Sequence, residues 1–141
     1  MNPLDLLPHR PPMRLVDEIV ELTAGERARG RRRLRPDDFF FDGHFPGEAI
    51  VPAIILVEML AQVGGLAAAA PPLDSAPPGE PLRLRVAALG PFKFPSAAKP
   101  GDELDIRARV AGRLGALYKI EGDVTANGLV VATGSVTLGE G

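Results

Sequence analysis

The chain has 141 residues, of which 45% are hydrophobic and 24% are charged, so we expect one globular domain over residues 1–141. The net charge of −2 argues against nucleic-acid binding, and the absence of cysteine excludes disulfides, thiolate metal sites and a cysteine nucleophile. The N-terminal residues lack the basic and apolar regions of a signal peptide, which favours a cytoplasmic location.

The first third of the chain predicts two strands and a turn. The strands are expected over residues 13–22 and 27–35, on either side of a bend at Ala24 and Gly25. A second turn is expected at Asp42-Gly43-His44-Phe45-Pro46-Gly47, because its glycines and proline are typical of an irregular, shaped backbone.

Residues 51–70 are almost wholly apolar, and their number equals that of a membrane-spanning helix. Glu58 near the middle, the Gly64-Gly65 pair and the lack of flanking Lys or Arg argue against a span. The segment instead predicts a helix that begins around Pro52, is buried in a protein core and ends before Pro71. Its polar side chains, Glu58 and Gln62, lie four residues apart on one face.

The second half predicts mainly strands. Residues 71–81 contain five prolines and are expected to form a semi-rigid connector, followed by a strand at 83–89. Apolar and polar residues alternate over 104–110 and 118–124, and Asn127-Gly128 then separates a further strand at 129–132, as in a two-residue hairpin. One long buried helix among antiparallel strands predicts an α+β architecture in which the sheet wraps around the helix.

His44 is the first candidate for chemistry, because histidine exchanges a proton near neutral pH and can act as a general base or acid. A loop histidine that only hydrogen-bonds a neighbour is the alternative, and for His44 taken alone it is the favoured interpretation. With one other histidine and no paired ligands nearby, the sequence does not have the pattern of a zinc site.

Glu58 is the second candidate, since glutamate is rarely buried without a partner and its helix neighbours are apolar. Burial raises the pKa of a carboxyl group, so we expect Glu58 to be able to hold a proton at pH 7 and donate it. A structural hydrogen bond to Gln62 or a contact between subunits is the alternative.

The start of the helix is the third candidate. Unpaired N–H groups near Ala53 and Ile54 can hold a carbonyl oxygen that gains negative charge when a proton leaves the neighbouring carbon. Ala53 and Glu58 are about 7–8 Å apart along the helix axis, so a small acyl group fits between them. This set favours acid–base elimination over hydrolysis, because no Gly-x-Ser-x-Gly motif is present.

The order of these motifs resembles the β-hydroxyacyl-acyl-carrier-protein dehydratases, a family with the hot-dog fold. The matching segments are Leu7-Pro8-His9-Arg10-Pro11-Pro12, Leu15-Val16-Asp17, Phe40-Phe41-Asp42-Gly43-His44-Phe45-Pro46-Gly47, Ile50-Val51-Pro52 and Leu56-Val57-Glu58-Met59-Leu60-Ala61-Gln62, with weaker matches at Phe92-Lys93 and Lys99-Pro100-Gly101-Asp102. Glutamate at position 58 is similar to the dehydratase branch of the family rather than to its dehydratase-isomerase branch.

The resemblance implies a hot-dog fold, an antiparallel sheet wrapped around one long central helix. It implies that His44 takes a proton from C2 of a 3-hydroxyacyl thioester and that Glu58 protonates or orients the departing hydroxyl, which gives a trans-2-enoyl thioester and water. Ala53 stands where the family's amide holds the thioester carbonyl, and Phe45 and Gln62 are further expected substrate-binding residues. No cofactor and no metal are implied.

The implied partner is an acyl carrier protein that carries the substrate on phosphopantetheine. A coenzyme A thioester is the alternative form of the substrate. The resemblance also implies a homodimer or a trimer of dimers, without nucleic acid or membrane, in which His44 of one subunit faces Glu58 of the other. His9 is interpreted as structural. Basic candidates for receiving the acidic carrier are Arg10, Arg14, Arg31, Arg32, Arg33, Lys93 and Lys99.

Two positions depart from the family pattern: Ala49 replaces a proline and Ala53 replaces the glycine at the helix start. A methyl group at position 53 can crowd the thioester carbonyl, because glycine permits closer backbone approach. A weakly active or non-catalytic acyl-thioester-binding subunit is therefore the alternative function. A thioesterase is a third, less favoured because that family does not normally carry this His…Glu pair.

Overall fold

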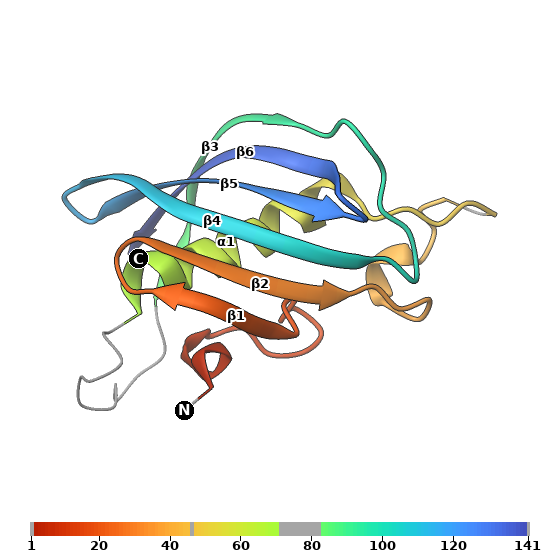
Figure 1. The fold of residues 1–141 in the computed structure, drawn as a ribbon, viewed down its shortest axis with the longest axis horizontal. Helices are drawn as coiled ribbons and strands as arrows, with labels where there is room; N and C mark the ends of the chain where they lie inside the picture. The colour runs from red at the N-terminus through yellow and green to blue at the C-terminus, as the bar shows by residue number, and fades with distance from the viewer. Residues whose placement is uncertain (1, 46, 71–82, 141) are drawn as a thin grey trace.

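A six-stranded antiparallel sheet, with the strand order β1-β2-β4-β5-β6-β3, curves around one long helix (Figure 1). This computed structural model describes residues 2–45, 47–70 and 83–140. Its elements are η1 (Pro3–Leu6), β1 (Glu18–Thr23), β2 (Arg27–Arg33), η2 (Phe39–Phe41), α1 (Ala53–Ala69), β3 (Leu84–Lys93), β4 (Glu103–Leu114), β5 (Leu117–Ala126) and β6 (Leu129–Glu140). The expected α+β architecture, with the sheet wrapped around the helix, is confirmed.

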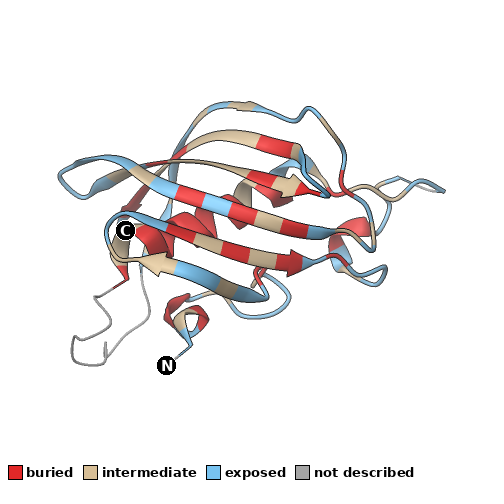
Figure 2. Ribbon diagram, in the orientation of Figure 1, coloured by how far each residue is buried: buried red, intermediate tan, exposed pale blue. Residues whose placement is uncertain are grey.

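The core lies between α1 and the concave face of the sheet. Buried positions alternate along the strands, as Leu104 and Ile106 do on β4, and they face a helix whose Met59 and Leu60 are fully buried (Figure 2). The helix and sheet approach closely at glycines: a Cβ added at Gly64 would lie 2.6 Å from Ile120 Cγ2 on β5. The first turn of α1 differs, because Ala53 and Ile54 are exposed rather than buried.

The hairpin between β5 and β6 has the expected two-residue turn. Ala126 pairs with Leu129, and Asn127 and Gly128 both have positive φ, 53° and 79°, as the favoured hairpin turn requires. The strand after this turn is longer than predicted, because β6 continues to Glu140. The prediction ended too early because the alternation of apolar and polar residues along β6 is irregular. Its pairing with β5 has a register shift at Val124/Thr125, and Gly134 falls within the strand.

The strand predicted at 13–22 is wrong in its first half, since β1 begins at Glu18. The Asp17 N–H still donates to the Arg31 carbonyl of β2 at 2.8 Å. Before Asp17 the backbone is bonded to a side chain: Gln62 donates to the carbonyl of Met13 and accepts from the N–H of Leu15. The proline-rich connector predicted at 71–81 lies outside the described residues. No helix in the described parts of the chain is long and apolar enough to cross a membrane.

Candidate active site

His44 lies in the tight turn between η2 and α1, in the segment that projects past the end of the sheet (Figure 1). Gly43 and Gly47 have φ of 73° and 80°, the region in which glycine is favoured. Phe45 and Glu48 exchange backbone hydrogen bonds of 3.1 and 3.0 Å, which close the part of the turn that contains Gly47. The shaped turn predicted here is confirmed.

The His44 ring is held in one orientation by Ile50. The Nδ1 atom lies 3.1 Å from the carbonyl oxygen of Ile50, and the Ile50 N–H donates to the His44 carbonyl, also at 3.1 Å. Because a carbonyl oxygen can only accept, Nδ1 carries the hydrogen in this contact, which leaves the lone pair of a neutral ring on Nε2. The ring also stacks on Phe45, with 4.3 Å between centroids. The geometry presents Nε2 as a proton acceptor.

A cavity of about 360 Å³ lies beside this ring, lined by residues that include His44, Phe45, Ala53, Leu56, Phe94 and Ala98. The Val51 N–H donates to the Ala98 carbonyl at 2.9 Å, which joins the helix start to the far wall of the cavity. The N–H groups of Ala53 and Ile54 have no backbone partner within the described residues, as expected for the first turn of a helix. The cavity therefore combines an oriented base with the positive end of a helix dipole.

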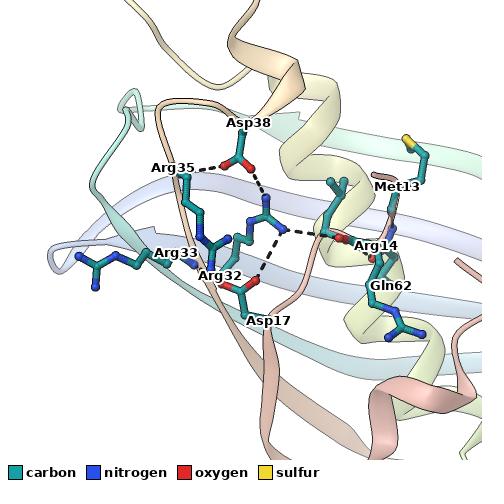
Figure 3. Close-up of polar contacts among 9 residues, drawn as sticks. Met13, Arg14, Asp17, Arg32, Arg33, Arg35, Asp38 and Gln62 are labelled. Atoms are coloured by element: carbon teal, nitrogen blue, oxygen red, sulfur yellow. Dashed lines mark hydrogen bonds and ion pairs between the residues drawn. The ribbon is translucent and has the colours of Figure 1, made fainter. Parts of the chain in front are cut away.

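Glu58 and Gln62 belong to a second group, on the face of α1 that meets the N-terminal segment. Glu58 Oε2 accepts a hydrogen bond from Gln62 Nε2 at 2.8 Å and lies 3.2 Å from His9 Nε2. Gln62 is only 1% exposed, and its amide also bonds to the backbone of Met13 and Leu15, the contacts drawn around it in Figure 3. Gln62 thus fixes Glu58 to the segment that precedes β1.

The expected raised pKa of Glu58 is wrong. Burial does raise the pKa of this carboxyl, and it is the largest single effect, but the hydrogen bonds from His9 and Gln62 and the charge of His9 together outweigh it. The pKa of Glu58 therefore lies below its ordinary value, and the carboxyl is ionised at pH 7. The sequence showed the apolar neighbours of Glu58 along the helix but not the donors that fold onto it.

The five predicted site residues fall into two groups within one chain. His44, Phe45 and Ala53 line the cavity, whereas Glu58 and Gln62 are not among its lining residues. Five residues along a helix turn the side chain by about 140°, so Ala53 and Glu58 are close along the axis but point to different sides. One chain alone does not place an acyl group between them.

A buried ion pair holds the turn that leads to His44. Arg32 of β2 donates to Asp38 at 2.6 Å and lies 3.7 Å from Asp17, with only 9% of its side chain exposed (Figure 3). These contacts join β2, the segment before β1 and the residues that enter η2. Arg32 is therefore structural, and its inclusion among the carrier-binding candidates is wrong.

Sequence reasoning missed three parts of these two groups. The contact between His9 and Glu58 has no sequence signal beyond the place of His9 in the N-terminal motif. The Ile50 carbonyl that orients His44 has no sequence signal, since every residue has a carbonyl. The segment from Phe94 to Ala98 that walls the cavity was not singled out either.

A curved six-stranded antiparallel sheet around one central helix defines the hot-dog class, as comparison with solved structures bears out. The dehydratase heterocomplex ApeI:P from Xenorhabdus doucetiae matches with a TM-score of 0.76 and 19% identity, over 100% of this chain and 91% of that one. A hypothetical thioesterase with coenzyme A from Streptococcus pneumoniae matches with a TM-score of 0.62 and 16% identity, over 88% and 84% of the two chains. At these identities the matches show the fold alone, and the expected hot-dog fold is confirmed.

Sequence comparison gives the family. The model of the FabA-like domain matches residues 7–135, and the chain belongs to this family. It is 33% identical to a 3-hydroxyacyl-[acyl-carrier-protein] dehydratase FabZ of Sorangium cellulosum, over 94% of this chain and 84% of the relative. It is also 33% identical to the FabZ of Bacillus subtilis, over 97% of this chain and 94% of the relative. The resemblance noted from the motifs is confirmed.

Proposed function

We propose that this chain is a dehydratase that converts 3-hydroxyacyl thioesters on acyl carrier protein to trans-2-enoyl thioesters, in fatty-acid or related lipid synthesis. The observation that carries the proposal is the His44 ring, whose Nδ1 is bonded to Ile50 so that Nε2 is left as a base beside a cavity with a helix start. The relatives that match over nearly the whole chain carry this activity in their names.

Two groups at this cavity act in the first step, the removal of a proton from the substrate. His44 Nε2 takes the proton from C2 of the substrate, and the electrons of that bond move toward the thioester carbonyl. The N–H groups of Ala53 and Ile54 then stabilise the negative charge on the carbonyl oxygen. A positioned base of this kind typically contributes about 10²–10⁴-fold to the rate.

Glu58 acts on the other end of the reacting bond, at the 3-hydroxyl. In its ionised form it accepts a hydrogen bond from the hydroxyl and aligns the C3–O bond for departure. The leaving oxygen needs a proton to depart as water. That proton comes from the His44 imidazolium formed in the first step, or from Glu58 after substrate binding has raised its pKa and it has taken up a proton from solvent. In the reverse hydration, ionised Glu58 is already in the form that takes a proton from water.

The proposed site needs two chains, with His44 of one subunit facing Glu58 of its partner. The separation of the two groups within one chain supports this arrangement. Ile54, Val57 and Glu58 share one helix face, and Ile54 is 77% exposed, which suits contact with a second copy. β3 is an edge strand of the sheet and can pair with another β3. We propose a homodimer, alone or as the unit of a trimer of dimers.

The proposed partner is acyl carrier protein, with Arg10, Arg14, Arg31, Arg33, Lys93 and Lys99 as the remaining basic candidates for contact. We further propose that residues 1–141 act as one domain and that the protein works in the cytoplasm, which cell fractionation tests. Neither a cofactor nor a metal is part of the proposed mechanism. A coenzyme A thioester is the alternative carrier.

Hydration of crotonyl-acyl carrier protein, followed as loss of enoyl absorbance, tests the activity. Wild type should turn over, and His44→Ala and Glu58→Gln should each lose about 10²–10⁴-fold in kcat, provided that circular dichroism shows all three to be folded. Absence of turnover in folded, oligomeric wild type over several acyl chain lengths would contradict the proposal. That result would favour a binding subunit, for which the exposed Ala53 methyl at the cavity is the one supporting feature. Release of carrier thiol would instead indicate a thioesterase.

A further inference from the structure

The N-terminal segment adds a side chain to the Glu58 group that the mechanism above does not use. His9 Nε2 lies 3.2 Å from Glu58 Oε2, and both side chains are 27% exposed. The backbone of His9 is itself held, because its carbonyl accepts from Arg10 Nη1 at 2.9 Å and from Arg14 Nε at 3.3 Å. His9 is therefore a fixed part of this group rather than a loose surface residue.

The surroundings of the two ring nitrogens of His9 indicate which of them carries the hydrogen. Nε2 faces a carboxylate oxygen, which can only accept, so Nε2 carries a hydrogen and donates it. Nδ1 is buried and has no partner among the described residues, so no acceptor is present to favour a hydrogen on that side. The contact has a direction, from the imidazole N–H to the glutamate.

Both donors to Glu58 meet the same oxygen. Gln62 Nε2 and His9 Nε2 each approach Oε2, whereas Oε1 has no hydrogen bond within the described residues. Gln62 cannot rotate to follow Glu58, because its amide is also bonded to Met13 and Leu15. A carboxylate pinned through one oxygen by two donors presents the other oxygen in a fixed direction.

We propose that His9 is a positioning residue of the active site, which with Gln62 holds Oε2 of Glu58 so that Oε1 is directed at the substrate hydroxyl. The inference rests on the proposed function of Glu58, and it adds His9 to the residues of the proposed site. His9 touches no substrate in this account and acts through Glu58 alone.

Replacement of His9 by phenylalanine and by glutamine tests this role, because the phenylalanine fills the space without a donor and the glutamine restores one. We expect kcat for enoyl hydration to fall about 10- to 100-fold in His9→Phe with little change in KM, as for loss of a hydrogen bond to a charged group. His9→Gln should stay within about threefold of wild type, because its amide can donate to the same oxygen.

A second readout does not depend on turnover. The side-chain carboxyl of Glu58 can be titrated by carbon NMR, with its resonance assigned by its absence in Glu58→Gln. Loss of the His9 donor removes a contact that lowers the pKa of Glu58, so this pKa should rise in His9→Phe and stay low in His9→Gln. The acid limb of the rate profile should move in the same direction.

Unchanged kcat and an unchanged Glu58 titration in folded His9→Phe would overturn the proposal. Equal losses of activity and of unfolding free energy in His9→Phe and His9→Gln would also overturn it, because they would mark a purely structural role. Inactive wild type would refute the proposed function, whereas the NMR titration would still decide whether His9 controls Glu58. The failures of the two proposals are therefore distinguishable.

Discussion

Two opposing effects act on the pKa of the Glu58 carboxyl group. Its burial disfavours the charged form, while the N–H groups of His9 and Gln62 favour it, and the donors prevail. The result is an ionised carboxylate with one committed oxygen and one available oxygen. Such a group suits the orientation of a hydroxyl, or the activation of water in the reverse reaction, more directly than it suits storage of a proton.

The lowered pKa of Glu58 has a consequence for stability at acid pH. The stabilisation it provides is complete above the ordinary carboxyl pKa of 4.5 and is lost as the pH falls through the lower pKa of the folded state. We expect the difference in unfolding free energy between wild type and Glu58→Gln to shrink as pH falls below 4.5, in urea titrations from pH 7 to 3. Glu26→Gln, a change at an exposed glutamate, is the control. A pH-independent difference between wild type and Glu58→Gln would show that no such linkage exists.

Ala53 is the residue at which this chain departs from its family at the helix start. Its side chain is exposed at the cavity, where a methyl group limits how closely a carbonyl can approach the Ala53 N–H. We expect Ala53→Gly to raise kcat/KM for enoyl hydration by about tenfold, equal to about 1.4 kcal/mol of transition-state stabilisation. Steady-state kinetics of folded protein measure the change, and a fall in kcat/KM would show that the methyl group is part of a productive fit.

At the scale of the elements, the approach of α1 to the sheet fixes where the site residues stand. Gly64 allows this approach, because a Cβ there would meet Ile120 Cγ2 at 2.6 Å. The neighbouring Gly65 does not have this role, since its nearest atom would be Leu138 Cδ1 at 3.9 Å. Adjacent glycines in one helix therefore make different contributions to packing.

This difference gives a matched pair of variants. Gly64→Ala should destabilise the protein by about 1–3 kcal/mol through overpacking against β5. Gly65→Ala should stabilise it by about 0.5–1 kcal/mol, because alanine loses less conformational freedom in a helix than glycine does. Urea unfolding measures both changes. Equal effects of the two substitutions would contradict the packing described for α1.

Sequence periodicity predicted best the elements whose backbone hydrogen bonds go to a neighbouring strand. The strict alternation from Leu104 to Val110 and the Asn127-Gly128 turn correspond to β4 and to the β5–β6 hairpin. Residues 13–17 were also predicted to be part of a strand, but the backbone of Met13 and Leu15 bonds to the side chain of Gln62, a residue more than forty positions away. Local periodicity contains no information about such a distant partner.

The site shows the same limit in a different form. The sequence identified His44, Glu58 and Ala53, and it predicted the turn that positions His44, because glycine spacing and buried charge are local signals. It missed the angle between Ala53 and Glu58 around the helix, since only their axial separation was considered. It also gave the wrong sign for the pKa shift of Glu58, because His9 reaches that carboxyl only through the fold.

At the scale of the whole molecule, the separation of the two groups is the central feature. His44 and its cavity lie at the start of α1, and Glu58 with His9 lies on another side of the same helix. The exposed Ile54 and the edge strand β3 are surfaces on which a second copy can join the two halves. Two-fold symmetry would then create two equivalent sites per dimer, each using His44 from one chain and Glu58 from the other.

Mixing two inactive variants tests this account most directly. His44→Ala and Glu58→Gln are dissociated together, reassociated in equal amounts and assayed for enoyl hydration, with differently tagged chains confirming that mixed dimers form. A mixed dimer has one site with both substitutions and one intact site, so random pairing should restore about a quarter of the wild-type activity. Mixed dimers as inactive as the separate variants, beside active wild type, would contradict the account and place both residues in a single-chain site.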